Sequence, residues 1–304
     1  MTIAAPSDQA RLMRLASFAS VRAALLLIVL KFGSFLEAAS LSLLSSLFDS
    51  ALDAAASIVI LIAIRQALVP ADAEHRFGHG KAEPLAGLVQ VAFILGSSVV
   101  LAVEVIDRFR TGAAVTEMET GVTVMVISLL VTGLLVLLQR HVVRRTGSIA
   151  IRSDQAHYAT DFLVNISVIA ALVLSTRLGW WWIDPTIGLC IAIFIAGAAL
   201  RVGKAALDML MDREMDEADR SRIKDIVRAH PEVMNLHDLR TRASGRDRFI
   251  QFHMELDGSL TLLQAHRISE MVEAEVCAAF PGAEVIIHED PAGASEPHAS
   301  YQYH

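Results

Sequence analysis

The chain has 304 residues, of which 54% are hydrophobic and only 19% are charged, and its mean hydropathy is +0.50. This composition is too apolar for an ordinary soluble enzyme of the same length and predicts a membrane protein. The formal net charge of −7 arises after Met211, where the balance is −8 against +1 before it, and such an acidic C-terminal region argues against a nucleic-acid partner.

Six stretches in the first two thirds of the chain are candidates for membrane helices, because a spanning helix needs about 20 mostly apolar residues. They cover residues 15–36, 41–68, 82–107, 118–140, 151–177 and 184–208. Most Lys and Arg residues lie on the side of the two termini, which predicts that both termini are cytoplasmic. Lys31, inside the first stretch, is an exception that either extends to the membrane surface or faces a water-filled cavity.

The remainder of the chain is patterned like a soluble α+β domain. The predicted elements are a helix at 216–230, strands at 233–242 and 248–257, a helix at 261–279 and a strand at 284–289. In the second strand, Ile250, Phe252 and Met254 alternate with polar residues, as a half-buried strand requires. We therefore expect a sheet with helices on one face.

These patterns divide the chain into three parts. They are a six-helix transmembrane domain at 1–211, a soluble domain at 212–291 and a short polar tail at 292–304, which is expected to be disordered.

The strongest functional signal is a pair of spacings inside predicted membrane helices. Asp49 and Asp53 are four residues apart in the second helix, and His157 and Asp161 are four apart in the fifth. Residues at i and i+4 lie one turn apart on the same helical face. A single Asp at the centre of a membrane helix costs about 2.5–3.5 kcal/mol, so three carboxylates require a function or partners to explain them.

A bound metal ion supplies such a partner. Three carboxylates and one imidazole suit tetrahedral Zn²⁺, which binds Asp oxygen and His nitrogen at about 2.0–2.2 Å. The two cysteines, Cys190 and Cys277, offer no thiolate cage that would favour Cu⁺. Zn²⁺ is therefore the first expectation, while Cd²⁺, Fe²⁺, Mn²⁺ and Co²⁺ remain open alternatives.

A second group of candidate ligands lies in the loop between the second and third helices. Asp72, His75 and His79 can converge on one ion because glycines at 78 and 80 allow tight turns. A solvated loop without a ligand is the alternative, and proximity to a membrane metal site favours the functional interpretation.

The C-terminal domain holds a third group. Four histidines, together with Glu289 and Asp290 near the end of the last strand, predict a metal-binding surface. The histidines are His237, His253, His266 and His288.

Nearly the whole chain resembles the cation diffusion facilitators, most closely their bacterial zinc and ferrous-iron efflux members. The segments that carry the resemblance are LFDSALDAAAS, PADAEHRFGHGKAEPLAGL, HYATDFLVN, WWIDPTIG, HDLRTRASG, RFIQFHMELDGSL, LLQAH and FPGAEVIIHEDP, in family order. The resemblance implies a ferredoxin-like αββαβ domain, a homodimer in the bacterial inner membrane, and a proton-coupled antiport cycle.

The resemblance also implies roles for the candidate residues. The transport site would be Asp49, Asp53, His157 and Asp161, and the loop site Asp72, His75 and His79. The cytoplasmic site, a binuclear centre at the dimer contact, would comprise His237, His253, His266, His288 and Asp290. Lys81 and Asp212 would form a salt-bridge lock between protomers, with Asp208 as a competitor for Asp212. Glu289 stands where close members of the family carry Gln and either joins the metal shell or faces water.

The predicted function is thus a secondary active transporter, not an enzyme, which exports divalent metal cations from the cytoplasm in exchange for protons. Its partners are the metal ions, protons, the lipid bilayer and a second copy of the chain. Two alternatives stay open: a membrane-anchored metal sensor, which leaves the intramembrane carboxylates unexplained, and a metal channel, whose flux would ignore the proton gradient.

Overall fold

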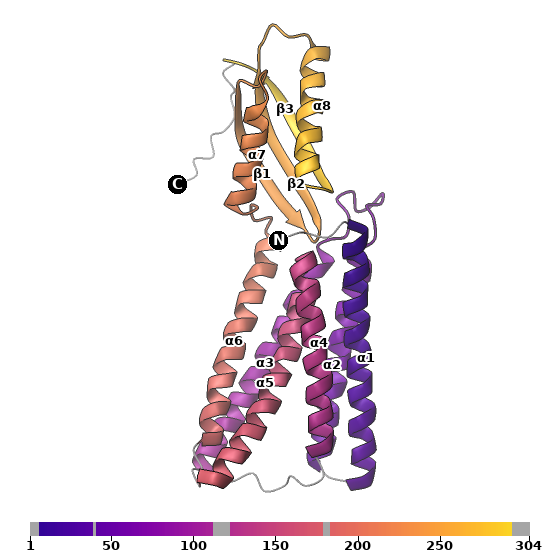
Figure 1. Cartoon of the computed structure of the whole chain (residues 1–304), viewed down its shortest axis with the longest axis vertical. Coiled ribbons are helices and arrows are strands. Elements are labelled where there is room, and N and C mark those ends of the chain that lie inside the picture. The colour runs from indigo at the N-terminus through magenta and orange to yellow at the C-terminus, as the bar shows by residue number, and fades with distance from the viewer. Residues whose placement is uncertain (1–5, 39–40, 112–121, 179–182, 294–304) are drawn as a thin grey trace. The chain divides into compact units, whose positions relative to one another are not determined.

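The computed structural model describes residues 6–38, 41–111, 122–178 and 183–293 (Figure 1). The chain forms two compact units, Met1–Met211 and Asp212–His304. Most of the predicted tail, from residue 294 onward, lies outside the described residues.

The first unit is a bundle of six long helices. They are α1 (Pro6–Ala38), α2 (Leu41–Ala67), α3 (Ala82–Thr111), α4 (Val122–Thr146), α5 (Ile149–Leu178) and α6 (Ile183–Leu210). Helices α1 and α4 extend beyond the apolar stretches seen in the sequence. Polar residues such as Arg11 in α1 and Arg144 in α4 continue the helix past the apolar part, because a helix need not end where its hydrophobic stretch ends.

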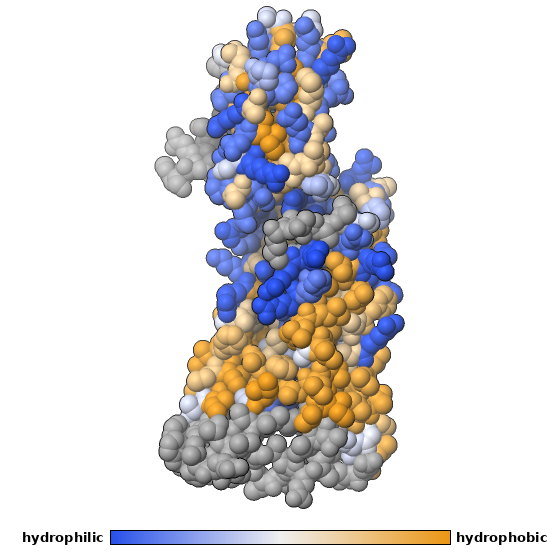
Figure 2. All heavy atoms as spheres, viewed as in Figure 1, coloured by the Kyte–Doolittle hydropathy of each residue, from blue (hydrophilic) through white to orange (hydrophobic). Residues whose placement is uncertain are grey.

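Large apolar side chains cover much of the face of this bundle that Figure 2 shows, in orange. Val29, Val103, Leu134 and Ile193 are each more than 60% exposed, which is the arrangement expected where lipid rather than water surrounds the helices. Within the described residues, five helices contain a stretch long and apolar enough to cross a membrane. These stretches are Ser7–Leu36, Leu47–Ala67, Ala82–Asp107, Val126–Thr146 and Pro185–Leu210.

Helix α5 is as long as the others but is not among the five that contain such a stretch in the described part of the chain. It carries Asp154, His157 and Asp161, and it packs against α3, α4 and α6 as well as touching α1 and α2. An ionisable residue in such a helix is tolerated when it faces the bundle interior. Thus α5 places two carboxylates and an imidazole within the helical unit.

The second unit has the order α7 (Glu217–Ala229), β1 (Asn235–Ser244), β2 (Asp247–Leu256), α8 (Leu262–Ala279) and β3 (Ala283–Pro291). The strands form one sheet in which β2 is central, antiparallel to β1 and parallel to β3. A capping box between Thr261 and Gln264 fixes the start of α8. The predicted fold class, a helical transmembrane region followed by a soluble αββαβ domain, is confirmed.

The core of this domain lies between one face of the sheet and the two helices. Ile250, Phe252 and Met254 of β2 are buried against α7 and α8, which contribute Val227 and Val272 among others. The alternate residues of β2, which include Gln251 and His253, occupy the opposite face of the sheet. That open face is therefore available for polar residues.

Truncating the central core residue should destabilise the domain selectively. We expect Phe252→Ala to lower the free energy of unfolding by about 3–5 kcal/mol, because Phe252 is 1% exposed and its loss leaves a cavity. Hydrogen exchange of the β2 amides in the full chain measures this loss. Gln251→Ala, the neighbouring exposed position, should stay within about 0.5 kcal/mol of the parent, and an equal effect of both variants would contradict the assignment of the core face.

Candidate metal centres

One cluster of ligand atoms lies inside the helical unit. The Nε2 atom of His157 lies 2.9 Å from an oxygen of Asp53 and 3.7 Å from an oxygen of Asp161. Asp53 comes from α2, whereas His157 and Asp161 lie one turn apart on α5. One ligand atom from each residue falls within 4.8 Å of the others, close enough for all three to hold one ion. His157 itself is 5% exposed.

Asp49, the fourth predicted ligand, lies one turn before Asp53 on α2 and is exposed. It is not one of the three residues whose ligand atoms converge in this structure. The same stretch of α2 contains Ser50, which accepts a hydrogen bond of 2.7 Å from the ammonium group of Lys31 on α1. Lys31 therefore points toward α2 and not along α1 to the membrane surface.

A further carboxylate, which the spacing of the sequence did not reveal, is buried beside this cluster. Asp154 on α5 is fully buried, and its Oδ2 accepts hydrogen bonds from the hydroxyl of Ser20 (2.5 Å) and the amide of Gln139 (2.8 Å). These contacts join α5 to α1 and α4. One turn on, the hydroxyl of Tyr158 lies 2.8 Å from that of Ser57 on α2. Together the contacts hold the ligand-bearing helix in place.

The loop residues Asp72, His75 and His79 also converge. A carboxylate oxygen of Asp72 lies 3.4 Å from Nδ1 of His75, and the other lies 3.4 Å from Nε2 of His79. The turn depends on Gly78, whose φ of 76° is left-handed and favours glycine. The backbone amides of Glu74 and His75 donate to Asp72 at 2.9 and 2.7 Å, so the carboxylate is held in the loop before any ligand arrives.

The cluster in the C-terminal domain is built by strand register. His237 of β1 pairs with His253 of β2, which pairs with His288 of β3, so the three imidazoles form a row across the open face. Asp290 lies beside the row: its oxygens are 2.8 Å from His253, 3.1 Å from His288 and 3.6 Å from His237. His237, His253 and Asp290 place their ligand atoms within 4.8 Å of one another.

An irregularity in β1 shapes one end of this row. The register shifts between His237 and Arg240, and Asp238 between them has a positive φ of 46°. Two acids that motif spacing did not identify also lie near the imidazoles. Glu255 is 3.2 Å from His237, and Asp238 is 4.0 Å from His253. Glu255 pairs with Asn235, which places Glu255 at the edge of the cluster. This position follows from the strand register and not from the spacing of residues in the sequence.

Two predicted ligands lie apart from this row. His266 is on α8, where its Nε2 lies 3.5 Å from Glu270, and the row is on the opposite face of the sheet. Glu289 lies apart from the cluster: it is half-buried and accepts a hydrogen bond of 2.6 Å from Ser269 of α8. The alternation of β3 explains the difference, because Glu289 points away from the face that carries His288 and Asp290.

The two residues of the predicted lock belong to different units. Lys81 donates a hydrogen bond of 3.4 Å to the carbonyl of Leu210 within the helical unit. Asp212 lies 3.4 Å from Arg242 within the C-terminal domain. Their pairing stays a prediction.

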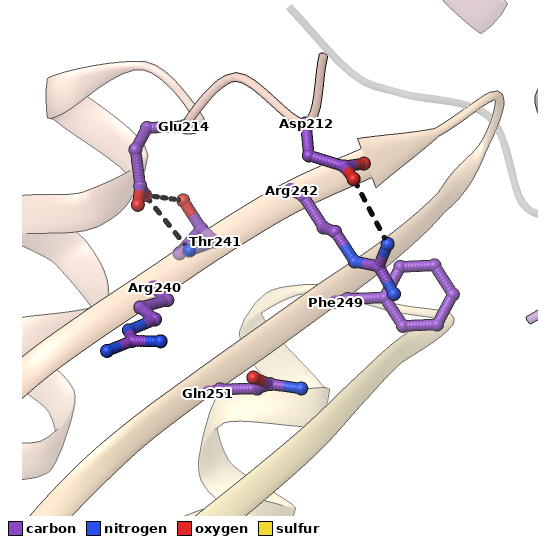
Figure 3. Close-up of a pocket in the computed structure, with 7 residues that line it drawn as sticks. All are labelled: Asp212, Glu214, Arg240, Thr241, Arg242, Phe249 and Gln251. Atoms are coloured by element: carbon purple, nitrogen blue, oxygen red, sulfur yellow. Dashed lines mark hydrogen bonds and ion pairs between the residues drawn. The ribbon is translucent and has the colours of Figure 1, made fainter. Parts of the chain in front are cut away.

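Asp212 also lines a hollow of about 370 Å³ in the C-terminal domain, which Figure 3 shows. Its other lining residues are Glu214, Arg240, Thr241, Arg242, Phe249 and Gln251. The charged groups there have partners within the domain: Arg240 contacts Asp238, Arg242 contacts Asp212, and Glu214 accepts from Thr241. None of the histidines of the row lines this hollow.

The arrangement defines a class of protein. Apolar helices enclose an acid-and-histidine cluster, and a soluble domain carries another on the open face of its sheet. Such donor sets bind divalent metal cations, so the arrangement is that of a multi-pass membrane protein that binds metal ions.

Comparison with known families agrees with this class. Residues 17–211 match the family described as "Cation efflux transmembrane domain", and residues 215–292 match "Cation efflux protein, cytoplasmic domain". The chain belongs to the cation efflux family, the cation diffusion facilitators, and its activity is the efflux of metal cations. This family consists of transporters.

Known relatives cover most of the chain. A protein of Shewanella oneidensis named cation-efflux pump FieF is 48% identical over 278 residues, 91% of this chain and 94% of that one. One of the same name from Salmonella arizonae is 44% identical over 281 residues, 92% and 93% of the two chains. A structure titled "Metal-bound C-terminal domain of CzcD transporter from Thermotoga maritima" is 28% identical, covers 27% of this chain and 100% of that one, and gives a TM-score of 0.26.

The hydrogen bonds to Asp72 give a test of the loop. The backbone amide of His75, followed by that of Glu74, holds the pKa of the Asp72 carboxyl below its ordinary value. A lowered pKa means that the stabilisation by the carboxylate is present above the ordinary Asp value of about 3.9 and is lost as pH falls through the lowered value. In metal-free protein, we expect protection of these two amides against hydrogen exchange to persist at pH 5.

The matched variants separate charge from hydrogen bonding in this loop. Asp72→Asn keeps an acceptor oxygen and should retain protection with little pH dependence, whereas Asp72→Ala should lose it. Equal protection in Asp72→Ala and the parent would contradict the role of this side chain.

Proposed function

We propose that this protein exports divalent transition metals, Zn²⁺ foremost, from the cytoplasm in exchange for protons. The observation that carries the proposal is the convergence of Asp53, His157 and Asp161 inside a bundle of apolar helices. Carboxylates in such surroundings are costly without compensating charge, and a transported cation supplies it. Asp49, one turn from Asp53, would provide the fourth ligand after a change of side-chain rotamer.

Exchange with protons follows from the chemistry of the donors. Carboxylates and imidazole must be deprotonated to coordinate a metal, so binding releases protons and protonation releases the metal. Protons entering from the outside would displace the ion and return the protein to its inward-facing state, which is an alternating-access cycle. The donor set of oxygens and one nitrogen suits Zn²⁺, with Fe²⁺ and Cd²⁺ as further substrates.

The charge distribution supports an orientation in the bacterial inner membrane. Arg65 lies in the last turn of α2, and Arg144 and Arg145 lie in the last turn of α4. Arg152 lies in the first turn of α5, so basic residues gather at one end of the helices. This end would be cytoplasmic under the positive-inside rule, with both termini on the same side and α5 as the sixth span.

Substitution of the ligands tests the transport site. In proteoliposomes with an imposed pH gradient, Asp53→Ala and His157→Ala should slow Zn²⁺ uptake by at least the roughly 10–100-fold that loss of supporting residues costs at metal sites. Asp8→Ala, which removes an exposed carboxylate near the start of α1, is the matched control. Uptake by Asp53→Ala as fast as by the parent would refute the site.

The same assay addresses the mechanism and the metal. Collapse of the pH gradient should reduce Zn²⁺ accumulation, and uptake indifferent to the gradient would indicate a channel. Uptake of Mn²⁺ faster than Zn²⁺ would overturn the metal preference.

The C-terminal cluster would bind regulatory or structural metal at a dimer contact. His266 lies on the helix-covered side of its own domain, so it would reach a histidine row only in a second copy of the chain. The match to a cation efflux cytoplasmic domain supports this assignment. The loop residues Asp72, His75 and His79 would offer a further site on the cytoplasmic side.

Mixed dimers test whether the site is shared. His253→Ala and His266→Ala should each weaken Zn²⁺-dependent dimerisation of the full chain, measured by light scattering. Mixing the two variants should restore one intact site per dimer, because one chain then supplies the row and the other supplies His266. His141→Ala, an exposed histidine outside all three clusters, is the control. Normal Zn²⁺ affinity in His266→Ala would show that the cluster is confined to one chain.

A further inference from the structure

The ammonium group of Lys31 lies inside the helical unit, where a positive charge has a cost. Lys31 is only partly exposed, and its Nζ donates to the hydroxyl of Ser50, which is 1% exposed. A lysine near the end of a membrane helix usually extends to the surface. Here the side chain instead crosses from α1 to α2, so another interaction holds it in the interior.

That interaction is with the acids of the transport site. Ser50 lies between Asp49 and Asp53 in the sequence of α2, so its hydrogen bond brings the ammonium to the turn of α2 that carries both acids. Lys31 interacts electrostatically with Asp53, Asp161 and Asp49, and Asp49 and Asp161 in turn each interact with Lys31. Opposite charges close together offset the cost of burying each of them.

The charges of this group balance when a divalent cation is added. Asp49, Asp53 and Asp161 contribute three negative charges when ionised, and Lys31 contributes one positive charge. A divalent cation on neutral His157 and the three carboxylates brings the sum over the cation and these five residues, Lys31 included, to zero. Without Lys31 the loaded site would carry a net negative charge in apolar surroundings, which would hold the cation more tightly.

We propose that Lys31 is a resident counter-cation of the transport site, which keeps the metal-loaded site neutral and limits its affinity so that the ion can be released. The inference rests on the proposed function of Asp49, Asp53, His157 and Asp161. It makes Lys31 a residue that tunes affinity without being a ligand, because an ammonium group has no lone pair to coordinate a metal.

Three substitutions separate the charge from the hydrogen bond. Lys31→Gln keeps a donor for Ser50 but removes the charge, Lys31→Met removes both, and Lys31→Arg keeps the charge. Zn²⁺ binding is measured by calorimetry on the full chain in nanodiscs at fixed pH. The component lost in Asp53→Ala identifies the transport site among the other metal clusters.

We expect the Kd for Zn²⁺ at this site to fall about tenfold in Lys31→Gln and Lys31→Met, and to stay within about threefold in Lys31→Arg. In proteoliposomes the neutral variants should show a lower KM together with a lower kcat, because release of the ion becomes slower. A merely structural lysine would not produce this split.

The outcomes distinguish the inference from the proposed function. If Asp53→Ala removes no binding component, the transport site itself is wrong. If Asp53→Ala removes it but Lys31→Gln binds Zn²⁺ like the parent or more weakly, only the counter-cation role fails. Failure of both neutral variants to assemble as monodisperse protein, while Lys31→Arg assembles, would mean that the charge serves the fold and would also overturn the role.

Discussion

The structure of the helical unit depends on how it compensates ionised groups in apolar surroundings. Its outer surface carries many large hydrophobic side chains, so an ionised carboxylate within the bundle is costly unless a partner compensates its charge. Asp154 accepts two hydrogen bonds at its Oδ2, from Ser20 and Gln139, whereas Asp53 and Asp161 contact the imidazole of His157. The contacts of Asp154 tie α5 to α1 and α4, whereas those of Asp53 and Asp161 place oxygen and nitrogen atoms where a cation can bind.

The fold could be predicted from sequence because its signals are local. Apolar stretches of the length of a bilayer marked the helices, and the alternation of Ile250, Phe252 and Met254 marked the central strand and its buried face. The ends of α1 and α4 were missed, since polar residues continue these helices beyond the apolar stretch. Hydropathy locates the apolar part of a helix. It does not indicate the residue at which the backbone hydrogen bonds of the helix end.

The candidate sites were predictable where ligands share one element. The i,i+4 spacing gave His157 and Asp161 directly, but the contact of Asp154 with Ser20 and Gln139 joins three helices and leaves no local pattern. Lys31 looked like an exception in an apolar stretch until its bond to Ser50 placed it beside the acids. The acid Glu255 likewise depends on the register between β1 and β2. These contacts depend on how separate elements pack together. Such packing leaves no regular spacing of residues that could be recognised in a single sequence.

The two clusters use the same donors on elements that differ in how they can move. In the C-terminal domain, His237, His253 and His288 are held by hydrogen bonds between neighbouring strands, and shifting one of them requires breaking the register of the sheet. In the helical unit, Asp53 lies on α2 while His157 and Asp161 lie on α5, and no backbone hydrogen bonds tie two helices to each other. A small shift of α5 relative to α2 would therefore separate Asp53 from the other two candidate ligands without unfolding either helix. A site divided in this way suits an ion that must be bound and then released, whereas a site built on strand register suits an ion that stays.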